Sequence, residues 1–273
     1  MTINLDKFEA WCRLRTSQAS AEQYRKIAER FIKKYGENFT IDDVEDFFTE
    51  LAMQNRKHNT IAKYYYALKK LFEFLKRDDE YARIPPIKFE EVEVDWLPTN
   101  KVIKLVDSIE DIRDKAIVAT LYALGIRARE LIALDRSDFD FKNMQVTVRV
   151  QKKRGKVVIV QKKIDDWLKD KIEAYWELRT DRNPAAFVTY RGAKRLSYRR
   201  LEEIVTYWTE KILKKKYRSH VVGRHSRGAQ LARMGVGVKL RAEFLGVTEK
   251  TAERYSHLAP MDLQKIPPPD LAP

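Results

Sequence analysis

The side chains best suited to chemistry gather in one stretch near the C-terminus, residues 220–257. This stretch holds three of the four histidines, together with Arg224 and Tyr255, in helix-like segments broken at two glycines. A tyrosine that attacks a phosphodiester must lose its proton, the charge gained at phosphorus must be held, and the departing oxygen must gain a proton. The planar, permanently charged guanidinium of arginine suits the second task. A lysine or a histidine suits the third as general acid.

The chain offers one candidate for each of these tasks. They are Arg127 and Arg224 for the phosphate oxygens, Tyr255 as nucleophile, His220 for proton transfer, and a lysine of the basic turn 151–156. These steps need no metal ion, and the sequence has no carboxylate or cysteine cluster of ligand type, so neither a metal nor a cofactor is predicted. The competing interpretation is a basic helical segment that contains an ordinary buried tyrosine.

Composition limits the class of protein. The chain has 273 residues, of which 44% are apolar, enough for a sizeable core in one large or two smaller domains. No apolar run approaches the roughly 18 residues of a membrane helix. The first 20 residues include Asp6 and Glu9 and do not follow a signal-peptide pattern, and the single Cys12 excludes an intramolecular disulfide. We therefore expect a cytoplasmic protein without structural metal or membrane contact.

The positive charge is concentrated in one part of the chain. The total is +14; residues 1–92 hold 17 basic and 16 acidic residues, whereas residues 93–273 hold 37 basic and 24 acidic residues. A field concentrated on one part of a protein indicates a polyanionic partner, most commonly a nucleic acid.

Hydrophobic spacing predicts two domains. Residues 1–80 have the 3.6-residue periodicity of a small helical bundle, with Ser20 expected to cap one of its helices. Residues 81–96 contain two prolines and an acidic stretch and are expected to form a linker. A second domain over 97–258 and a proline-rich C-terminal tail over 259–273 follow.

The second domain is expected to contain a β-hairpin. Residues 144–150 alternate between apolar and polar side chains, and a glycine-containing basic turn leads into a second apolar run, 157–160. The predicted fold class is therefore mainly α with a small antiparallel β-hairpin or sheet, an α+β arrangement.

Three short motifs resemble the conserved boxes of the tyrosine recombinases, the phage-integrase and Xer-like enzymes. The motifs are LYALGIRAREL at 121–131, RHS at 224–226 and RYSH at 254–257. The steps from Arg224 to Gly235 and from Gly235 to Gly246 are both 11 residues, which matches the family.

The resemblance assigns roles to individual residues. It makes Arg127 and Arg224 the two catalytic arginines and Tyr255 the nucleophile. Glu130 either serves the reaction or braces an arginine by charge pairing, and His225 is expected to pack or cap.

Several positions depart from the family pattern. The family has a histidine three residues before its second arginine; Val221 holds that position here, and His220 lies one residue further away. A one-residue insertion before the helix would bring His220 into place. Val247 replaces a histidine or tryptophan that can donate a hydrogen bond. The hairpin lysine is Lys152 or Lys153, and the order of the hairpin residues favours Lys152.

The resemblance implies a helical core-binding domain followed by a catalytic domain, forming a C-shaped clamp around double-stranded DNA. It implies a covalent 3′-phosphotyrosine intermediate without ATP. It also implies a homotetramer on two DNA sites, linked through the C-terminal segment, and a monomer or dimer off DNA. The predicted function is that of a site-specific recombinase or integrase, of the kind that mobile genetic elements carry.

Two alternatives remain open. One is a DNA-binding relative impaired in cleavage, which Val247 and the displaced His220 suggest. The other is a topoisomerase IB-like enzyme that uses the same chemistry as a monomer to relax DNA.

Overall fold

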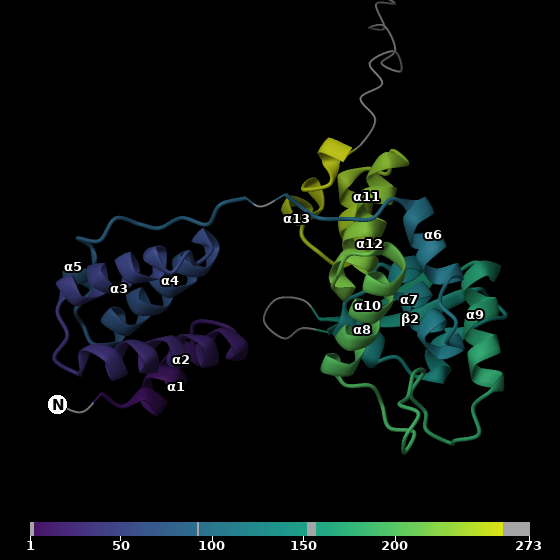
Figure 1. The fold of residues 1–273 in the computed structure, drawn as a ribbon, viewed down its shortest axis with the longest axis horizontal. Helices are drawn as coiled ribbons and strands as arrows, with labels where there is room; N and C mark the ends of the chain where they lie inside the picture. The colour runs from purple at the N-terminus through teal and green to yellow at the C-terminus, as the bar shows by residue number, and fades with distance from the viewer. Residues whose placement is uncertain (1–2, 92, 152–156, 259–273) are drawn as a thin grey trace, which may run out of the picture. The chain divides into compact units, whose positions relative to one another are not determined.

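The computed structural model describes residues 3–91, 93–151 and 157–258. The chain divides into two compact units, Met1–Glu93 and Val94–Pro273, each with its own hydrophobic core. Figure 1 labels most of their helices and the strand β2. The predicted fold class is confirmed, since helices dominate both units and the described residues form a single three-stranded antiparallel sheet. No helix in these residues is long and apolar enough to cross a membrane.

The first unit consists of helices packed around an apolar core. Its elements are α1 (Leu5–Arg13), α2 (Gln18–Tyr35), α3 (Ile41–Met53), α4 (His58–Phe74) and α5 (Asp78–Tyr81). The helix α2 begins earlier than the sequence suggested, because Ser17 rather than Ser20 accepts the capping hydrogen bond. Thr40 caps α3 in a reciprocal capping box with Asp43.

Aromatic side chains fill this first core. The ring of Phe31 lies 5.0 Å from that of Phe39 and 5.3 Å from that of Phe47, in edge-on arrangements that aromatic pairs favour. Tyr81 is buried, and its hydroxyl donates to the Tyr65 carbonyl at 2.7 Å. The core of the first unit therefore includes the start of the segment predicted as a linker. The roles and boundaries proposed for the domains stay a prediction.

The second unit carries every predicted site residue. Its helices and strands are α6 (Thr99–Asp107), α7 (Ile112–Leu124), α8 (Ala128–Ile132), η1 (Arg136–Asp138), β1 (Phe139–Asp140), β2 (Gln145–Gln151), β3 (Val157–Lys163), α9 (Asp166–Glu177), α10 (Tyr198–Leu213), the π-helical turn η3 (Val221–His225), α11 (Ser226–Arg233), α12 (Val238–Leu245), α13 (Glu249–Glu253) and η4 (Ser256–Leu258).

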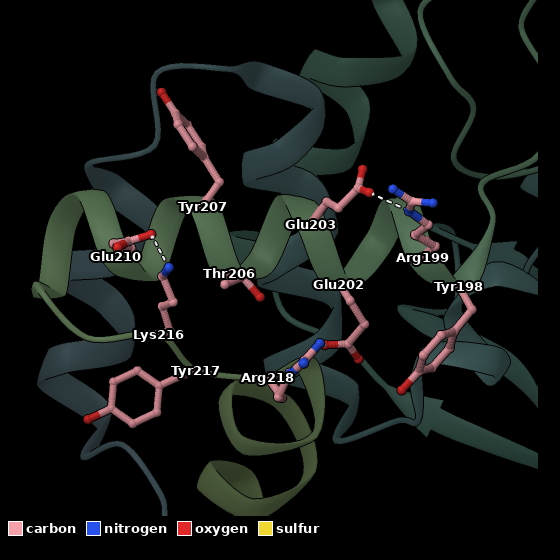
Figure 2. A pocket seen from close by; sticks show the side chains of 10 residues that line it. All are labelled: Tyr198, Arg199, Glu202, Glu203, Thr206, Tyr207, Glu210, Lys216, Tyr217 and Arg218. Atoms are coloured by element: carbon pink, nitrogen blue, oxygen red, sulfur yellow. Dashed lines mark hydrogen bonds and ion pairs between the residues drawn. The ribbon is translucent and has the colours of Figure 1, made fainter.

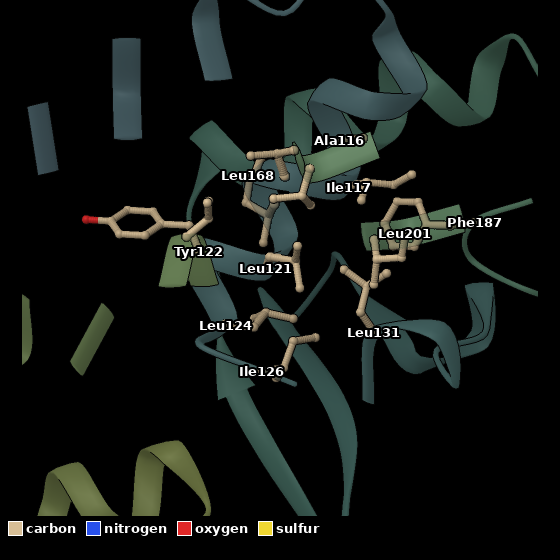
Figure 3. Close-up of a cluster of buried hydrophobic side chains, with 14 of the residues drawn as sticks. Ala116, Ile117, Leu121, Tyr122, Leu124, Ile126, Leu131, Leu168, Phe187 and Leu201 are labelled. Carbon is tan, nitrogen blue, oxygen red and sulfur yellow. The ribbon is translucent and has the colours of Figure 1, made fainter. Parts of the chain in front are cut away.

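The helix α7 is the centre of this unit. Ten of its 13 residues are buried, and it packs against α9 and the π turn. After its charged first turn the helix is almost entirely apolar, as is typical of a core helix. Figure 3 shows its side chains Ile117 and Leu121 beside Leu131 of α8 and Leu201 of α10. The helix ends at Gly125, which adopts the left-handed conformation that glycine favours, and the chain turns from there toward Arg127.

The predicted hairpin is confirmed as the pair β2 and β3. The two strands are antiparallel, with Val148 opposite Val160, and β1 pairs with the other edge of β2. The apolar residues Val146, Val148 and Val150 of β2 are buried, as the alternation predicted.

Candidate active site

The predicted site begins where α8 starts. Arg127 is the residue before the first turn of this helix, and its backbone N–H donates to the Glu130 carboxylate at 2.8 Å. Its guanidinium also donates to Glu130, at 2.6 Å, and to the carbonyl of Gly246 at 3.3 Å. The Arg127 side chain remains 43% exposed. The helix terminus therefore fixes one arginine while leaving part of its guanidinium accessible.

Glu130 joins this arginine to the second one. Its buried carboxylate accepts a hydrogen bond at 2.9 Å from Nη2 of Arg224, a residue 94 positions further along the chain. Arg224 is itself 7% exposed, and burial lowers its pKa to about 10, with the Arg127 charge acting in the same direction and Glu130 opposing both. The bracing interpretation of Glu130 is confirmed, and the carboxylate braces both arginines.

Arg224 keeps two donors unused. Its Nε and Nη1 are buried without a hydrogen-bond partner among the described residues. A buried donor without a partner is costly, and a cation of this kind favours an anionic acceptor. Nε and Nη1 lie on different edges of the guanidinium, and each can donate a charge-assisted hydrogen bond to a phosphate oxygen. The arginine pair can therefore receive a phosphodiester.

Arg224 lies in a π turn, which accounts for the extra residue between His220 and Arg224. A π turn closes a ring from residue i to i+5, one residue more than an α turn, and such turns are frequent at functional sites. A residue four positions before Arg224 on a π turn therefore lies on nearly the same side of the helix as a residue three positions before it on an α turn. This is the spacing between His220 and Arg224. The extra residue falls inside Val221–His225 rather than before the helix. His220 directly precedes this turn and is exposed, with its ring 5.0 Å from that of His225.

A buried carboxylate also holds the start of this turn. Glu202 of α10 accepts hydrogen bonds from the backbone N–H of Ser219, at 3.2 Å, and from its hydroxyl. Figure 2 shows Glu202 in the wall of a hollow lined by α10 and by residues 216–218. The hollow shares no residue with the predicted site. Glu202 matters to the site because its hydrogen bonds with Ser219 fix the backbone directly before His220.

Tyr255 lies between α13 and η4 and is 3% exposed. Its ring packs on Gly228 of α11, where a Cβ atom would lie 2.7 Å from the ring carbon Cε2, so only glycine fits there. Burial raises the pKa of the phenol, while the charges of Arg224 and Arg254 act in the opposite direction. Among the described residues, the Tyr255 hydroxyl forms no hydrogen bond with Arg224 or the other predicted site residues. The phenol is therefore protonated at neutral pH.

The remaining histidines and Val247 have different surroundings. His225 contacts the Asp95 carbonyl through Nδ1, and burial lowers its pKa to about 4, so it packs as predicted and is neutral at pH 7. Val247 packs against the apolar cluster that contains Tyr255. His257 is exposed. The side chain at 247 therefore contributes packing rather than proton transfer.

The predicted lysines cannot be placed with the arginines. Lys152 and Lys153 lie outside the described residues, which stop at the end of β2 and resume at the start of β3. The structure does place Lys162 of β3 near the arginines, a residue that sequence reasoning did not single out. Alternation along β3 was the available signal, since Val158, Val160 and Lys162 share one face.

Arg241 is a second buried residue near the site that the sequence motifs did not indicate. It is 3% exposed and donates at 2.6 Å to the carbonyl of Val236 and at 2.6 Å to the hydroxyl of Ser256. It thereby fixes the residue directly after Tyr255. A basic residue within a helical face gives little sequence signal for such burial.

The second unit is therefore a mainly helical domain that holds two arginines on a shared carboxylate, together with a buried tyrosine. Solved structures share the fold. One is the XerH site-specific recombinase bound to a palindromic difH substrate, with a TM-score of 0.70 and 18% identity over 96% of this chain and 84% of that one. Another is a lambda integrase dimer bound to a COC′ core site, with a TM-score of 0.71 and 15% identity over 92% and 75%.

Sequence comparison identifies the family. A sequence profile of the phage integrase family matches residues 95–261, and the chain therefore belongs to this family, which includes the tyrosine recombinases. A tyrosine recombinase of Thermosipho africanus is 27% identical over 90% of both chains. The tyrosine recombinase XerC of Roseiflexus castenholzii is 29% identical over 80% of this chain and 74% of its own. At family level the chain is a DNA-binding recombinase.

Proposed function

We propose that this chain is a site-specific recombinase that cuts and rejoins double-stranded DNA through a 3′-phosphotyrosine at Tyr255. The observation that carries the proposal is the carboxylate of Glu130, which hydrogen-bonds to both Arg127 and Arg224. Arg224 keeps two further buried donors that have no partner among the described residues. Each of these donors can bind a non-bridging oxygen of the scissile phosphate with a charge-assisted hydrogen bond. Their hydrogen bonds strengthen as the phosphate gains charge, which favours the transition state over the bound substrate.

The proposed cleavage step conserves the number of phosphoester bonds. The Tyr255 oxygen forms a bond to phosphorus, and the bond from phosphorus to the 5′ oxygen breaks. His220 accepts the phenolic proton, and Lys152 or Lys153 donates a proton to the 5′ oxygen. Attack by a 5′ hydroxyl of a second strand reverses these steps and frees Tyr255. Neither water nor ATP takes part, because the phosphotyrosine retains the energy of the bond.

We propose the assembly from the family resemblance. The first unit acts as the core-binding domain, and the two units together enclose the DNA. Four copies act on two DNA sites, with the C-terminal segment linking neighbouring copies. The basic second part of the chain supplies the phosphate contacts.

One alternative has a specific observation in its favour. Val247 packs beside Tyr255 at the position where the family has a hydrogen-bonding side chain. A chain without that hydrogen-bonding group fits a DNA-binding relative impaired in cleavage.

Trapping covalent DNA tests the proposal. Nicked suicide substrates, which lose a short 5′ fragment after cleavage, are incubated with the full chain, and the attached DNA is sequenced. We expect DNA joined through its 3′ phosphate at one recurring sequence. Bound DNA without any covalent product would favour the impaired relative. Attachment without sequence preference, together with plasmid relaxation, would favour the topoisomerase-like alternative.

A further inference from the structure

Lys162, near the end of β3, is a buried cation to which the proposed chemistry gives no role. It is 2% exposed. In the described part of the chain, no carboxylate lies within ion-pair distance of its ammonium group. The next residue in the strand, Lys163, is exposed on the opposite face. A buried lysine without an ion pair is costly, so its partners indicate why the fold tolerates it.

The partners of Lys162 are two helix ends. Its Nζ donates to the carbonyl of Leu124 at 2.6 Å and to the carbonyl of Phe244 at 2.5 Å. It also lies 3.9 Å from the centre of the Phe244 ring, within the range of a cation–π contact. Leu124 ends α7, and Phe244 belongs to the last turn of α12. The last carbonyls of a helix lack intrahelical partners and favour a cation.

The turn after α12 packs at the same place, the junction where Lys162 meets the ends of α7 and α12. Gly246 has a φ of +62°, and a Cβ atom there would lie 2.6 Å from Cγ1 of Val150 in β2. The Gly246 carbonyl accepts a hydrogen bond from Arg127. Strands β2 and β3, the end of α7 and the end of α12 therefore meet at one point. From this point the chain leads through α13 to Tyr255.

We propose that Lys162 is a positioning residue that ties β3 to the ends of α7 and α12. These two hydrogen bonds keep Arg127, three residues beyond Leu124, at a fixed distance from the segment that leads to Tyr255. DNA cleavage requires that distance. This inference rests on the proposed function. Lys162 itself touches neither DNA nor the reacting atoms.

The charges around Lys162 agree with this role. Burial lowers its pKa to about 7; the cations Arg224, Arg227 and Arg127 act in the same direction, and Glu130 opposes them. A neutral amine still has N–H groups for both carbonyls, so the tie persists above pH 7. Because the folded pKa is below 10.5, the unfolded chain binds more protons between about pH 7 and 10.5. This lysine therefore makes stability rise with pH across that window.

The test compares Lys162→Met with Lys163→Met, which changes the neighbouring exposed lysine. The full chain is saturated with its suicide substrate, and the single-turnover cleavage rate and DNA affinity are measured. We expect Lys162→Met to keep the affinity and lose on the order of 10²-fold in rate constant, as a misplacement of about 1 Å can cause. Lys163→Met should match wild type. A lower adduct yield with an unchanged rate constant would mean a purely structural role and overturn the proposal.

A second measurement does not depend on cleavage. Amide hydrogen exchange over residues 238–253, without DNA, should be faster in Lys162→Met than in Lys163→Met. The stability gain of wild type between pH 7 and 9 should also be absent from Lys162→Met. Unchanged exchange would overturn the proposal, even if wild type formed no adduct and the proposed function had itself failed.

A third variant keeps the proposal testable should Lys162→Met not fold. Gly246→Ala opens the same junction by pushing against Val150 while Lys162 is retained. It should show the same faster exchange and the same loss in rate constant with unchanged DNA affinity. If Gly246→Ala had the amide exchange and the cleavage rate of wild type, the proposal that this junction positions Arg127 and Tyr255 would be wrong.

Discussion

The two units bury different kinds of side chain. Every buried polar or charged residue among the described positions belongs to the second unit, from Arg113 to Arg241. The first unit buries apolar and aromatic side chains, and its ion pairs lie at the surface. Burying a charge costs several kcal/mol unless it is well paired. Part of this cost falls at the predicted site, on Glu130 and Arg224. Other buried charges of the second unit, such as Lys162 and Arg241, hold helix ends and loops in place.

The largest expected difference between the units concerns a single carboxylate. Glu130→Gln keeps the shape of the side chain but leaves the buried Arg224 without its counter-charge, which should cost about 3–5 kcal/mol of unfolding free energy. The matched change in the first unit is Glu73→Gln, which removes a pair with Lys70 whose side chains are 27% and 30% exposed. That loss should be about 0–1 kcal/mol. Denaturant unfolding of the full chain, followed with a probe in each unit, measures both.

Two results would count against this difference. Equal losses for the two variants would mean that burial does not set the importance of these charges. A gain in stability for Glu130→Gln would mean that the arginines do not need the carboxylate in the absence of DNA.

The next effect separates catalysis from binding. Arg224→Ala removes donors aimed at oxygens that gain charge during the reaction, so cleavage should slow by about 10²–10³-fold. DNA affinity should fall much less, because we expect many of the other basic residues to share the phosphate contacts. The control is Arg30→Ala, which changes an exposed arginine of the first unit that hydrogen-bonds to Tyr64 and should leave the cleavage rate unchanged. Parallel losses in affinity and rate for Arg224→Ala would make it an ordinary phosphate contact.

The smallest effect concerns the π turn. His220→Ala should slow single-turnover cleavage by at least about 10²-fold if this histidine transfers a proton. His257→Ala, an exposed histidine two residues after Tyr255, should not. Deletion of Val221 shortens the turn by one residue and should retain more cleavage than His220→Ala does. A rate for His220→Ala within about threefold of wild type would remove it from the site.

The first unit was the more predictable of the two. Its helices follow from apolar residues at helical spacing, because its core needs only apolar surface. The error at Ser20 was local: two serines three residues apart both suit a helix start, and the geometry selected Ser17. The hairpin of the second unit was equally readable from its alternation.

The polar interior of the second unit was less predictable. The motifs located Arg127, Arg224 and Tyr255, but not the carboxylate bridge between arginines 97 positions apart in sequence. The π turn was visible only as a spacing one residue too long. Lys162 was missed because lysines are usually exposed, although the alternation of β3 placed it inward.

The proposed role of Tyr255 is tested by identifying the residue that becomes joined to DNA. Wild type and Tyr255→Phe are incubated with the trapped suicide substrate, digested, and analysed by mass spectrometry, while DNA affinity is measured in parallel. We expect a nucleotide attached to the wild-type peptide at Tyr255, no adduct in Tyr255→Phe, and nearly equal affinities. An adduct on another residue, or an undiminished adduct in Tyr255→Phe, would contradict the proposed role of Tyr255.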